Sequence, residues 1–392
     1  MKVVVRFVLA AVVFLAAVLL LTRVIGDGDT EVSGPSITRV ADVNGTWSIF
    51  RGDQRLLGRA EGSLADSLRL LWRFRTADEV RSCPVVAEGR VYVGSNDANV
   101  YAVNIADGSQ LWSHPTQGAV EAAPLVIEGT VYVGSSDGWV YALNAVDGSL
   151  KWRYETDAEV KASANWTGSP DGNDLRIVVG SYDNRLHCID AATGKAAWTY
   201  ETGYYINGAP AVGDGLAVFG GCDAVIHVVS LADGNDVAHI DADAYIAASA
   251  AFYENAVYLG NYERSFLSVD VAKREVLWRH EGQGPFLSSP AIDGDRVIVG
   301  CDDHKVYALN RDDGQVVWTF ETLGEVPSSP VVCGDRVVVG SSDGRLYMLS
   351  AKDGSRIWQY EIGRALASSP AVAGGKVFIG CDDGYLYAFG PP

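Results

Sequence analysis

The sequence predicts an all-β protein, an eight-bladed β-propeller of four-stranded blades. A glycine recurs along the chain in steps of 40 residues, with a single step of 46. A tryptophan follows most of these glycines at a constant distance of 18 residues. Asp-Gly pairs separate short runs of β-branched and aromatic residues, as tight turns between strands require. The recurring glycines are Gly94, Gly134, Gly180, Gly220, Gly260, Gly300, Gly340 and Gly380.

The second repeat shows what one copy contains. Residues 131–133, 140–143 and 150–152 are rich in β-branched and aromatic side chains and predict three strands. Asp137-Gly138 and Asp147-Gly148 lie between them and predict two turns whose glycines take positive φ. Together they give a short antiparallel meander that cannot bury both of its faces alone.

A fourth strand is expected ahead of each recurring glycine, where small residues often precede proline. Because the innermost strand of a blade is crowded around the axis, small side chains suit that position. The triplets are Ser82-Cys83-Pro84, Ala122-Ala123-Pro124, Gly208-Ala209-Pro210, Ser288-Ser289-Pro290, Ser328-Ser329-Pro330 and Ser368-Ser369-Pro370. They recur by architecture, with no His or Asp at a fixed distance, so no catalytic residue is predicted among them.

The two ends of the chain complement each other. The eighth repeat stops at Tyr387-Ala388-Phe389-Gly390 and lacks its outer strand. A spare outer strand, Leu70-Leu71-Trp72-Arg73-Phe74, stands before the first repeat, and its Trp72 lies 40 residues before Trp112. We therefore expect this N-terminal strand to complete the last blade, which removes open sheet edges.

Composition excludes some classes of function. The formal net charge is −18, which argues against a nucleic-acid partner. The six cysteines form no Cys-x-x-Cys pair, and neither a disulfide framework nor a metal site is predicted. His187 and His227 stand where most repeats have tyrosine, so we interpret them as aromatic replacements in a packing position.

The N-terminus predicts export. Residues 7–21 are an unbroken apolar run, preceded by Lys2 and Arg6 and followed by Arg23. Residues 1–26 are therefore expected to form a transmembrane or signal helix, kept as a membrane anchor or removed as a signal peptide. Residues 27–45 are polar and predict a linker, and residues 46–392 a single propeller domain, exported and membrane-anchored, facing the periplasm or the extracellular side.

The repeat resembles the propeller repeat of the pyrroloquinoline-quinone (PQQ) type. The second copy matches the pattern G-S-x-D-G-x-x-Y-A-L-x-x-x-D/T-G-x-x-x-W throughout. The segment from Trp47 to Asp53 is similar to the W-x-x-F-R-G-D lead-in of BamB-like exported propellers. The resemblance covers residues 47–390 and specifies the fold better than the function.

The resemblance implies two alternatives. One is a non-catalytic scaffold similar to the outer-membrane assembly factor BamB, without a cofactor, which binds envelope proteins or peptides. The other is a PQQ-dependent oxidoreductase, or a propeller that binds or senses a ligand at the envelope. Three features of that enzyme class are missing: an adjacent Cys-Cys pair, long insertions between blades, and a carboxylate-Asn set for calcium. We therefore predict a monomeric, protein-binding propeller, although the lipid-attachment cysteine of BamB is also missing.

A binding site is expected where the repeats differ. Residues that lead into the inner strands ring one mouth of a propeller, and their identity is free to vary. The candidate ligand- or partner-binding residues are Arg81, Glu121, Lys161, Trp166, Tyr205, Asn207, Tyr245 and Phe286. The fourth and fifth repeats diverge most, with Ala238 in place of tryptophan and Lys273-Arg274 at the second turn. We expect either a partner surface or relaxed packing there.

Overall fold

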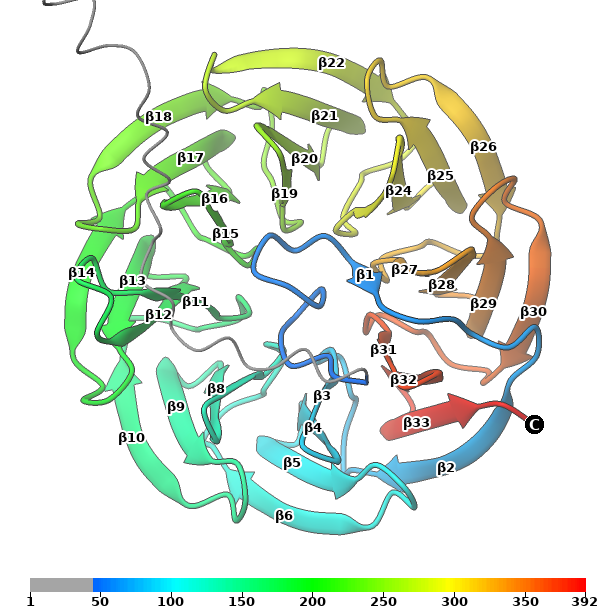
Figure 1. The fold of residues 1–392 in the computed structure, drawn as a ribbon, viewed down its shortest axis with the longest axis horizontal. Helices are drawn as coiled ribbons and strands as arrows, with labels where there is room; N and C mark the ends of the chain where they lie inside the picture. Colours follow the sequence, from blue (N-terminus) through cyan, green and yellow to red (C-terminus); the bar gives the residue numbers. More distant parts are fainter. Residues whose placement is uncertain (1–44) are drawn as a thin grey trace, which may run out of the picture. The chain divides into compact units, whose positions relative to one another are not determined.

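The computed structural model describes residues 45–392, which form eight β-sheets around a common axis (Figure 1). The fold is an all-β, eight-bladed propeller of four-stranded blades, as the 40-residue period predicts. Each blade runs from a short inner strand near the axis to a longer outer strand at the periphery.

The strands follow the repeats. Blades 1 and 2 contain β3 (Val85–Ala87), β4 (Arg90–Ser95), β5 (Asn99–Asn104), β6 (Gln110–Pro115), and β7 (Leu125–Ile127), β8 (Thr130–Gly134), β9 (Trp139–Asn144), β10 (Leu150–Glu155). Blades 3 and 4 contain β11 (Asn165–Gly168), β12 (Leu175–Gly180), β13 (Arg185–Asp190), β14 (Ala196–Glu201), and β15 (Ala211–Gly213), β16 (Leu216–Gly220), β17 (Val225–Ser230), β18 (Asp236–Asp241). Blades 5 and 6 contain β19 (Ala251–Tyr253), β20 (Ala256–Gly260), β21 (Ser265–Asp270), β22 (Glu275–Glu281), and β23 (Ala291–Asp293), β24 (Arg296–Cys301), β25 (Lys305–Asn310), β26 (Val316–Glu321).

The last two blades include strands from the N-terminal side of the domain. Blade 7 contains β27 (Val331–Cys333), β28 (Arg336–Gly340), β29 (Arg345–Ser350), β30 (Arg356–Glu361) and the short β1 (Arg59–Ala60), which pairs with β27 in parallel. Blade 8 contains β31 (Ala371–Ala373), β32 (Lys376–Gly380), β33 (Tyr385–Gly390) and β2 (Arg69–Arg75). β2 is antiparallel to β33, with Trp72 opposite Ala388 and Phe74 opposite Leu386.

The inner strands begin later than the sequence predicts. The small-x-Pro triplets precede these strands instead of forming them, and β3 starts at Val85, directly after Pro84. Proline lacks the N–H that a ladder requires, so the hydrogen-bonded strand starts one residue beyond it.

Neighbouring blades are joined by a tryptophan that packs on a glycine. The indole Nε1 of Trp112 donates to the carbonyl of Ala145 in blade 2 at 3.1 Å. A Cβ added to Gly148 would lie 2.6 Å from Cε3 of the same ring, so only glycine fits against it. The other pairs of this kind are Trp72 and Gly108, Trp152 and Gly194, Trp198 and Gly234, Trp278 and Gly314, and Trp318 and Gly354.

The divergence of blades 4 and 5 has a structural explanation. Ala238 replaces the tryptophan of blade 4, and Arg274 takes the place of the glycine that would face it in blade 5. With the large ring gone, the position accepts a side chain, and Arg274 Nη2 donates to the carbonyl of Val237 at 2.9 Å. The two substitutions are therefore a coupled change in packing between blades. Arg274 keeps the left-handed backbone of the glycine that it replaces, with φ +61°.

Residues 47–60, here called the belt, cross the centre of the ring and bind the inner strands one after another (Figure 1). The inner strand of a blade has a free edge whose N–H and C=O groups need partners, and the belt supplies them. Its backbone bonds to Val86, Val126, Val212, Phe252, Ile292 and Val332 have lengths of 2.7–2.9 Å. In blade 3 side-chain hydrogen bonds take the place of these backbone bonds. The Asn165 side chain donates to the Gln54 carbonyl, and the Gln54 side chain donates to the Trp166 carbonyl, both at 2.7 Å.

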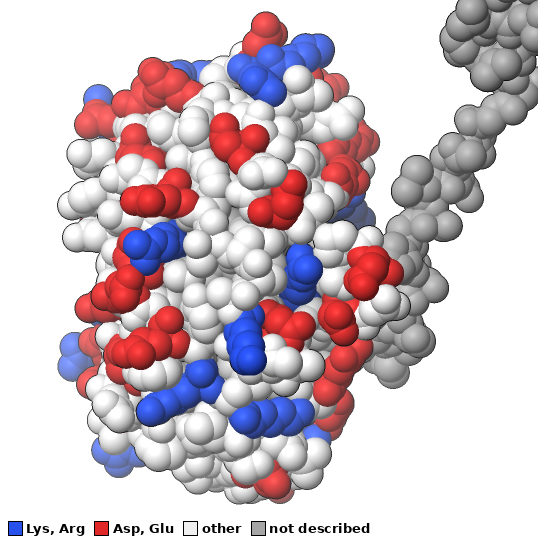
Figure 2. Space-filling model, turned by 90° about the vertical axis from the view of Figure 1, so that its left-hand side faces the viewer, with Lys and Arg blue, Asp and Glu red and all other residues white. Residues whose placement is uncertain are grey.

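The predicted helix of residues 1–26 and the linker of residues 27–45 lie outside the described residues, except for Gly45. Within residues 45–392 no helix is long and apolar enough to cross a membrane. The side view of the ring shows acidic and basic side chains interspersed on the outer strands (Figure 2).

Candidate binding rim

The connections from each outer strand to the next inner strand form one face of the ring, here called the rim. Each connection is held against the turn between the second and third strands of the neighbouring blade. Backbone bonds of 2.9–3.0 Å link Asn96 to Glu79, Tyr182 to Glu159, Cys222 to Tyr205 and Tyr262 to Tyr245. The same geometry in every blade gives the rim a rigid frame on which side chains vary.

An aspartate in most blades fixes the rim connections. Asp137 Oδ1 accepts from the Trp139 N–H within its own turn, and Oδ2 accepts from the Gln117 N–H of the adjacent connection at 2.8 Å. Tyr141, four residues later, donates its hydroxyl to the same Oδ2 at 2.7 Å. The equivalent pairs are Asp97 and Tyr101, Asp303 and Tyr307, Asp343 and Tyr347, and Asp383 and Tyr387.

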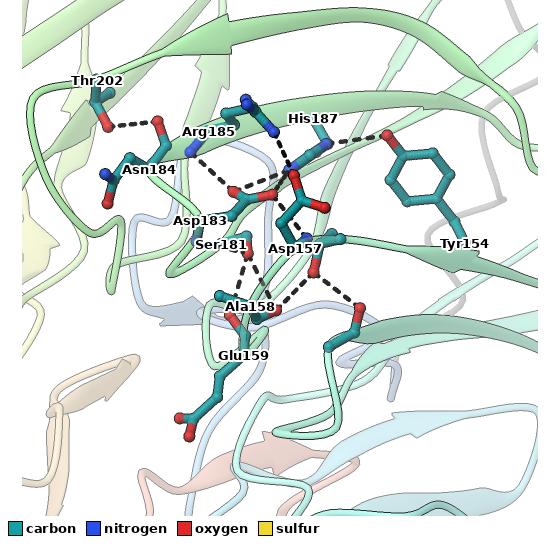
Figure 3. Close-up of polar contacts among 12 residues, drawn as sticks. Tyr154, Asp157, Ala158, Glu159, Ser181, Asp183, Asn184, Arg185, His187 and Thr202 are labelled. Atoms are coloured by element: carbon teal, nitrogen blue, oxygen red, sulfur yellow. Dashed lines mark hydrogen bonds and ion pairs between the residues drawn. The ribbon is translucent and has the colours of Figure 1, made fainter.

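His187 and His227 occupy the tyrosine position of this arrangement in blades 3 and 4. His187 Nε2 lies 3.0 Å from Asp183 Oδ2, and its Nδ1 lies 3.1 Å from the hydroxyl of Tyr154 in blade 2 (Figure 3). Burial opposes ionisation of Asp183, but the hydrogen bond and charge of His187, together with backbone N–H groups of Asp157 and Arg185, outweigh it and lower the pKa of Asp183. Both histidines are 3% exposed, so they serve the packing role that the sequence indicates.

Charged side chains of the rim form two groups of ion pairs, one around Arg81 and one around Lys161. Arg81 Nη2 lies 3.1 Å from Asp382 Oδ2, and Arg81 Nε lies 2.9 Å from Glu79 Oε2. Lys161 Nζ lies 3.6 Å from Glu121 and 3.1 Å from Glu159. The structure thus pairs Glu121 with Lys161 and leaves Arg81 in a neighbouring group, close enough that the charge of Glu121 helps to raise the pKa of Arg81.

Tyrosines continue the group around Lys161 over blades 3 to 5. Lys161 Nζ lies 5.5 Å from the ring centroid of Tyr182, whose hydroxyl donates to Asn207 Oδ1 at 2.8 Å. Tyr182 stacks on Tyr205 with ring centroids 4.8 Å apart, and Tyr205 stacks on Tyr204 at 4.2 Å. The exposed fractions of the outermost rings are 47% for Tyr204, 38% for Tyr205, 60% for Tyr245 and 46% for Tyr262.

Two predicted site residues do not belong to the rim surface. Phe286 is 0% exposed and packs on Phe266 and Tyr307. It occupies a position that is a buried aliphatic in the other blades, such as Val80 and Val326, so its assignment to an accessible site is wrong. Trp166 lies on the inner strand β11, where its carbonyl accepts from Gln54 of the belt.

Sequence reasoning did not assign Tyr182, Tyr204 or Tyr262 to the site, although Tyr262 lies in the diverged fifth repeat, for which a partner surface was one expectation. Tyr182 and Tyr262 stand two residues after a recurring glycine, where other repeats have Asn, Ser, Cys or Asp. That difference between repeats was a usable signal. Nothing in the sequence shows that side chains from two separate loops stack on each other, because this depends on how the connection lies against the turn.

Asp302 is a rim carboxylate with a buried oxygen, Oδ1, that lacks a hydrogen-bond partner among the described residues. Burial, together with Glu325 and Asp303, raises the pKa of Asp302 to about 6. Burial raises the pKa of Tyr262, and the nearby Cys222 and Asp302 raise it further.

The described part of the chain offers no group of three or more His, Cys, Asp or Glu residues arranged to hold a metal ion. Its six cysteines are free thiols. Burial raises the pKa of Cys188 and of Cys301 to about 12 and that of Cys333 to about 11, which makes these thiols poor nucleophiles.

The fold and the rim define an eight-bladed propeller whose repeated residues build the ring and whose variable residues form one face. The family model described as outer membrane protein assembly factor BamB matches residues 63–171, 158–237 and 222–391, and the chain belongs to this family. No curated protein sequence matches the chain significantly.

Solved structures share the fold at low identity. BamB from Moraxella catarrhalis is 19% identical, with a TM-score of 0.68 over 83% of this chain and 98% of that chain. The computationally designed Ika8 protein is 18% identical, with a TM-score of 0.72 over 82% of this chain and 100% of that chain. Quinohemoprotein alcohol dehydrogenase from Comamonas testosteroni is 13% identical, with a TM-score of 0.76 over 89% and 81%.

Proposed function

We propose that this protein is a non-catalytic scaffold of the cell envelope that binds a protein or peptide on its rim. The proposal places the chain outside the cytoplasm, anchored by residues 1–26. The observation that carries it is the group of exposed tyrosines, Tyr204, Tyr205, Tyr245 and Tyr262. Tyrosine is enriched at protein interfaces because its ring contributes a large contact area and its hydroxyl contributes a hydrogen bond.

The charged groups next to the tyrosines support the same proposal. An interface combines aromatic anchors with polar surroundings that set the register of the partner. Arg81, Glu121 and Lys161 are paired to one another or to neighbours but remain partly exposed, so a partner can exchange these pairs without first dehydrating buried charges. Membership of a family named after an outer membrane assembly factor supports a partner in the envelope.

Site-specific photocrosslinking tests the proposal. A benzoylphenylalanine at position 245 on the rim should crosslink to an envelope protein. The matched control is the same residue at position 277 on the outer strand β22, where Leu277 is 50% exposed. Crosslinks of equal yield and identity from both positions would refute a rim site.

Alanine substitution of Arg81, Glu121 and Lys161 provides the second readout. Exposed ion pairs contribute about 0–1 kcal/mol each, so the melting temperature of the triple variant should change little. The crosslink from position 245 should weaken at least tenfold. A large loss of stability would show that these residues have a structural role instead.

A PQQ-dependent oxidoreductase is the alternative, favoured by the similarity of the fold to that of alcohol and methanol dehydrogenases. It predicts that the purified protein, after incubation with PQQ and calcium, shows a bound chromophore and reduces a dye in the presence of an alcohol. Both results together would replace the scaffold proposal.

A further inference from the structure

A ring of serine hydroxyls surrounds the axis below the rim. Five serines each stand two residues before the first residue of an inner strand, as Ser163 does two residues after Lys161 of the rim. Each accepts a hydrogen bond from a backbone N–H of the preceding blade: Ser163, Ser249, Ser289, Ser329 and Ser369. The bonds measure 2.8–3.1 Å, and Cys83 Sγ accepts from the Ser369 N–H at 3.2 Å. We call these five serines the hydroxyl ring.

The hydroxyl protons of the ring are free to donate. Each oxygen already accepts an N–H, and the hydroxyls of Ser163, Ser249, Ser289 and Ser329 donate to no residue within 45–392. The neighbouring serines differ, because Ser288 donates to the Gly300 carbonyl at 3.0 Å. Ser289 and Ser329 keep 4% exposure whereas Ser288 and Ser328 have none. Because blades pack on both sides, the accessible surface of the ring lies toward the axis.

A buried guanidinium is bonded to the backbone next to two serines of this ring. Arg51 of the belt is 1% exposed, and its Nη2 donates to the carbonyls of Pro290 and Pro330 at 2.9 and 2.6 Å. These prolines immediately follow Ser289 and Ser329 of the ring. Cys83, which leads into blade 1, is near enough to influence the pKa of Arg51.

Arg51 makes no direct ion pair within the described residues, although Asp53 is close enough for its charge to raise the pKa of Arg51. Its Nε and Nη1 have no hydrogen-bond partner there. Burial lowers the pKa of Arg51 to about 10, so the group stays protonated at pH 7. Asp53, the nearest acid, is itself buried with a raised pKa, and its Oδ1 accepts from the Leu57 N–H at 3.3 Å. A buried cation with two unpartnered nitrogens and no direct ion pair is costly, so an anion beside it would stabilise the fold.

We propose that Arg51 and the hydroxyl ring form an axial site for one small anion of carboxylate size. The guanidinium supplies the charge and two unpartnered nitrogens, and the serine hydroxyls supply donors from several blades. Such a set matches a carboxylate, which accepts several hydrogen bonds at once. The site uses no rim residue, so it stands or falls independently of the protein-binding proposal.

Thermal melting of the full-length protein in sodium acetate tests the site. The wild type should show a saturable rise in melting temperature, above the unspecific effect that salt has on any protein. Replacing Arg51 removes its bonds to blades 6 and 7, so an R51Q variant that fails to fold would be uninformative. The double variant S289A/S329A avoids this problem, because Ala123 and Ala209 already occupy ring positions in blades 2 and 4.

In S289A/S329A the acetate concentration at half-saturation should rise at least tenfold, since each lost donor to a charged group weakens binding by about that factor. The matched control is S288A/S328A, whose hydroxyls are buried in the same two blades away from the axis. It should lower the melting temperature but keep the wild-type acetate midpoint. A wild type without a saturable component, or equal midpoints in wild type and S289A/S329A, overturns the axial site.

Discussion

The contact between Trp112 and Gly148 gives a sharp test of how the blades hold together. Trp112 is 7% exposed, and its removal in W112A leaves a large void and loses the hydrogen bond to Ala145. Truncations of this kind cost about 3–5 kcal/mol. Gly148 has φ +73°, and a methyl group there meets the indole at 2.6 Å. We expect G148A to cost about 3 kcal/mol, of which about 1 kcal/mol is left-handed backbone strain and the rest the clash with the ring.

The double variant separates these two contributions. With the indole absent, the clash disappears, so W112A/G148A should be about 2 kcal/mol more stable than the sum of the single effects predicts. G129A is the matched control, because Gly129 has φ +67° but no atom within 4 Å of an added Cβ. It should show the backbone cost alone, about 1 kcal/mol, and no coupling to W112A.

Urea denaturation followed by fluorescence provides the free energies of unfolding. Equal costs for G148A and G129A, or strictly additive effects of W112A and G148A, would refute the reasoning that ring contact restricts this position to glycine. The natural pair Ala238 and Arg274 is the same double change made once within the chain, and the predicted coupling explains why both positions differ together.

Two further predictions concern titration. Burial, the largest cause, lowers the pKa of His227, so the unfolded chain takes up this proton first and stability should fall as the pH drops below about 6.5. The variant H227Y restores, with Asp223, the Asp-Tyr pair of the other blades. It should reduce this loss of stability between pH 7 and pH 5 by up to about 1 kcal/mol. Melting curves at pH 7 and pH 5 check the prediction, and a loss equal to that of the wild type contradicts it. Because the pKa of Asp302 is raised to about 6, its charge destabilises the fold at neutral pH. D302N should therefore gain about 1 kcal/mol at pH 7, after allowance for solvent screening, about half of that at pH 5 and nothing at about pH 3, below the pKa of an unfolded aspartate. An equal gain at pH 7 and at pH 3 would exclude the carboxylate charge as the cause.

The candidate rim was only partly predictable from sequence. Arg81, Glu121, Lys161 and Asn207 were found because the repeats align position by position and these positions differ. Phe286 was misassigned because aromatic character drew attention to a position that Val80 and Val326 show to be buried. Trp166 stands five residues after Lys161, which along a strand moves it from the rim to the level of the belt.

The sequence by itself determined the repeat, the blade count and the strands within each blade. Turn residues and strand residues act locally, so a 40-residue period shows them without a structure. Only the tertiary structure decided the course of the belt, the coupling of Ala238 to Arg274, the stacking of Tyr182 on Tyr205 and the position of Arg51 next to the hydroxyl ring. Each of these joins residues from different blades or from opposite sides of the axis. Such contacts are set by the arrangement of the blades around the axis, which no local pattern records.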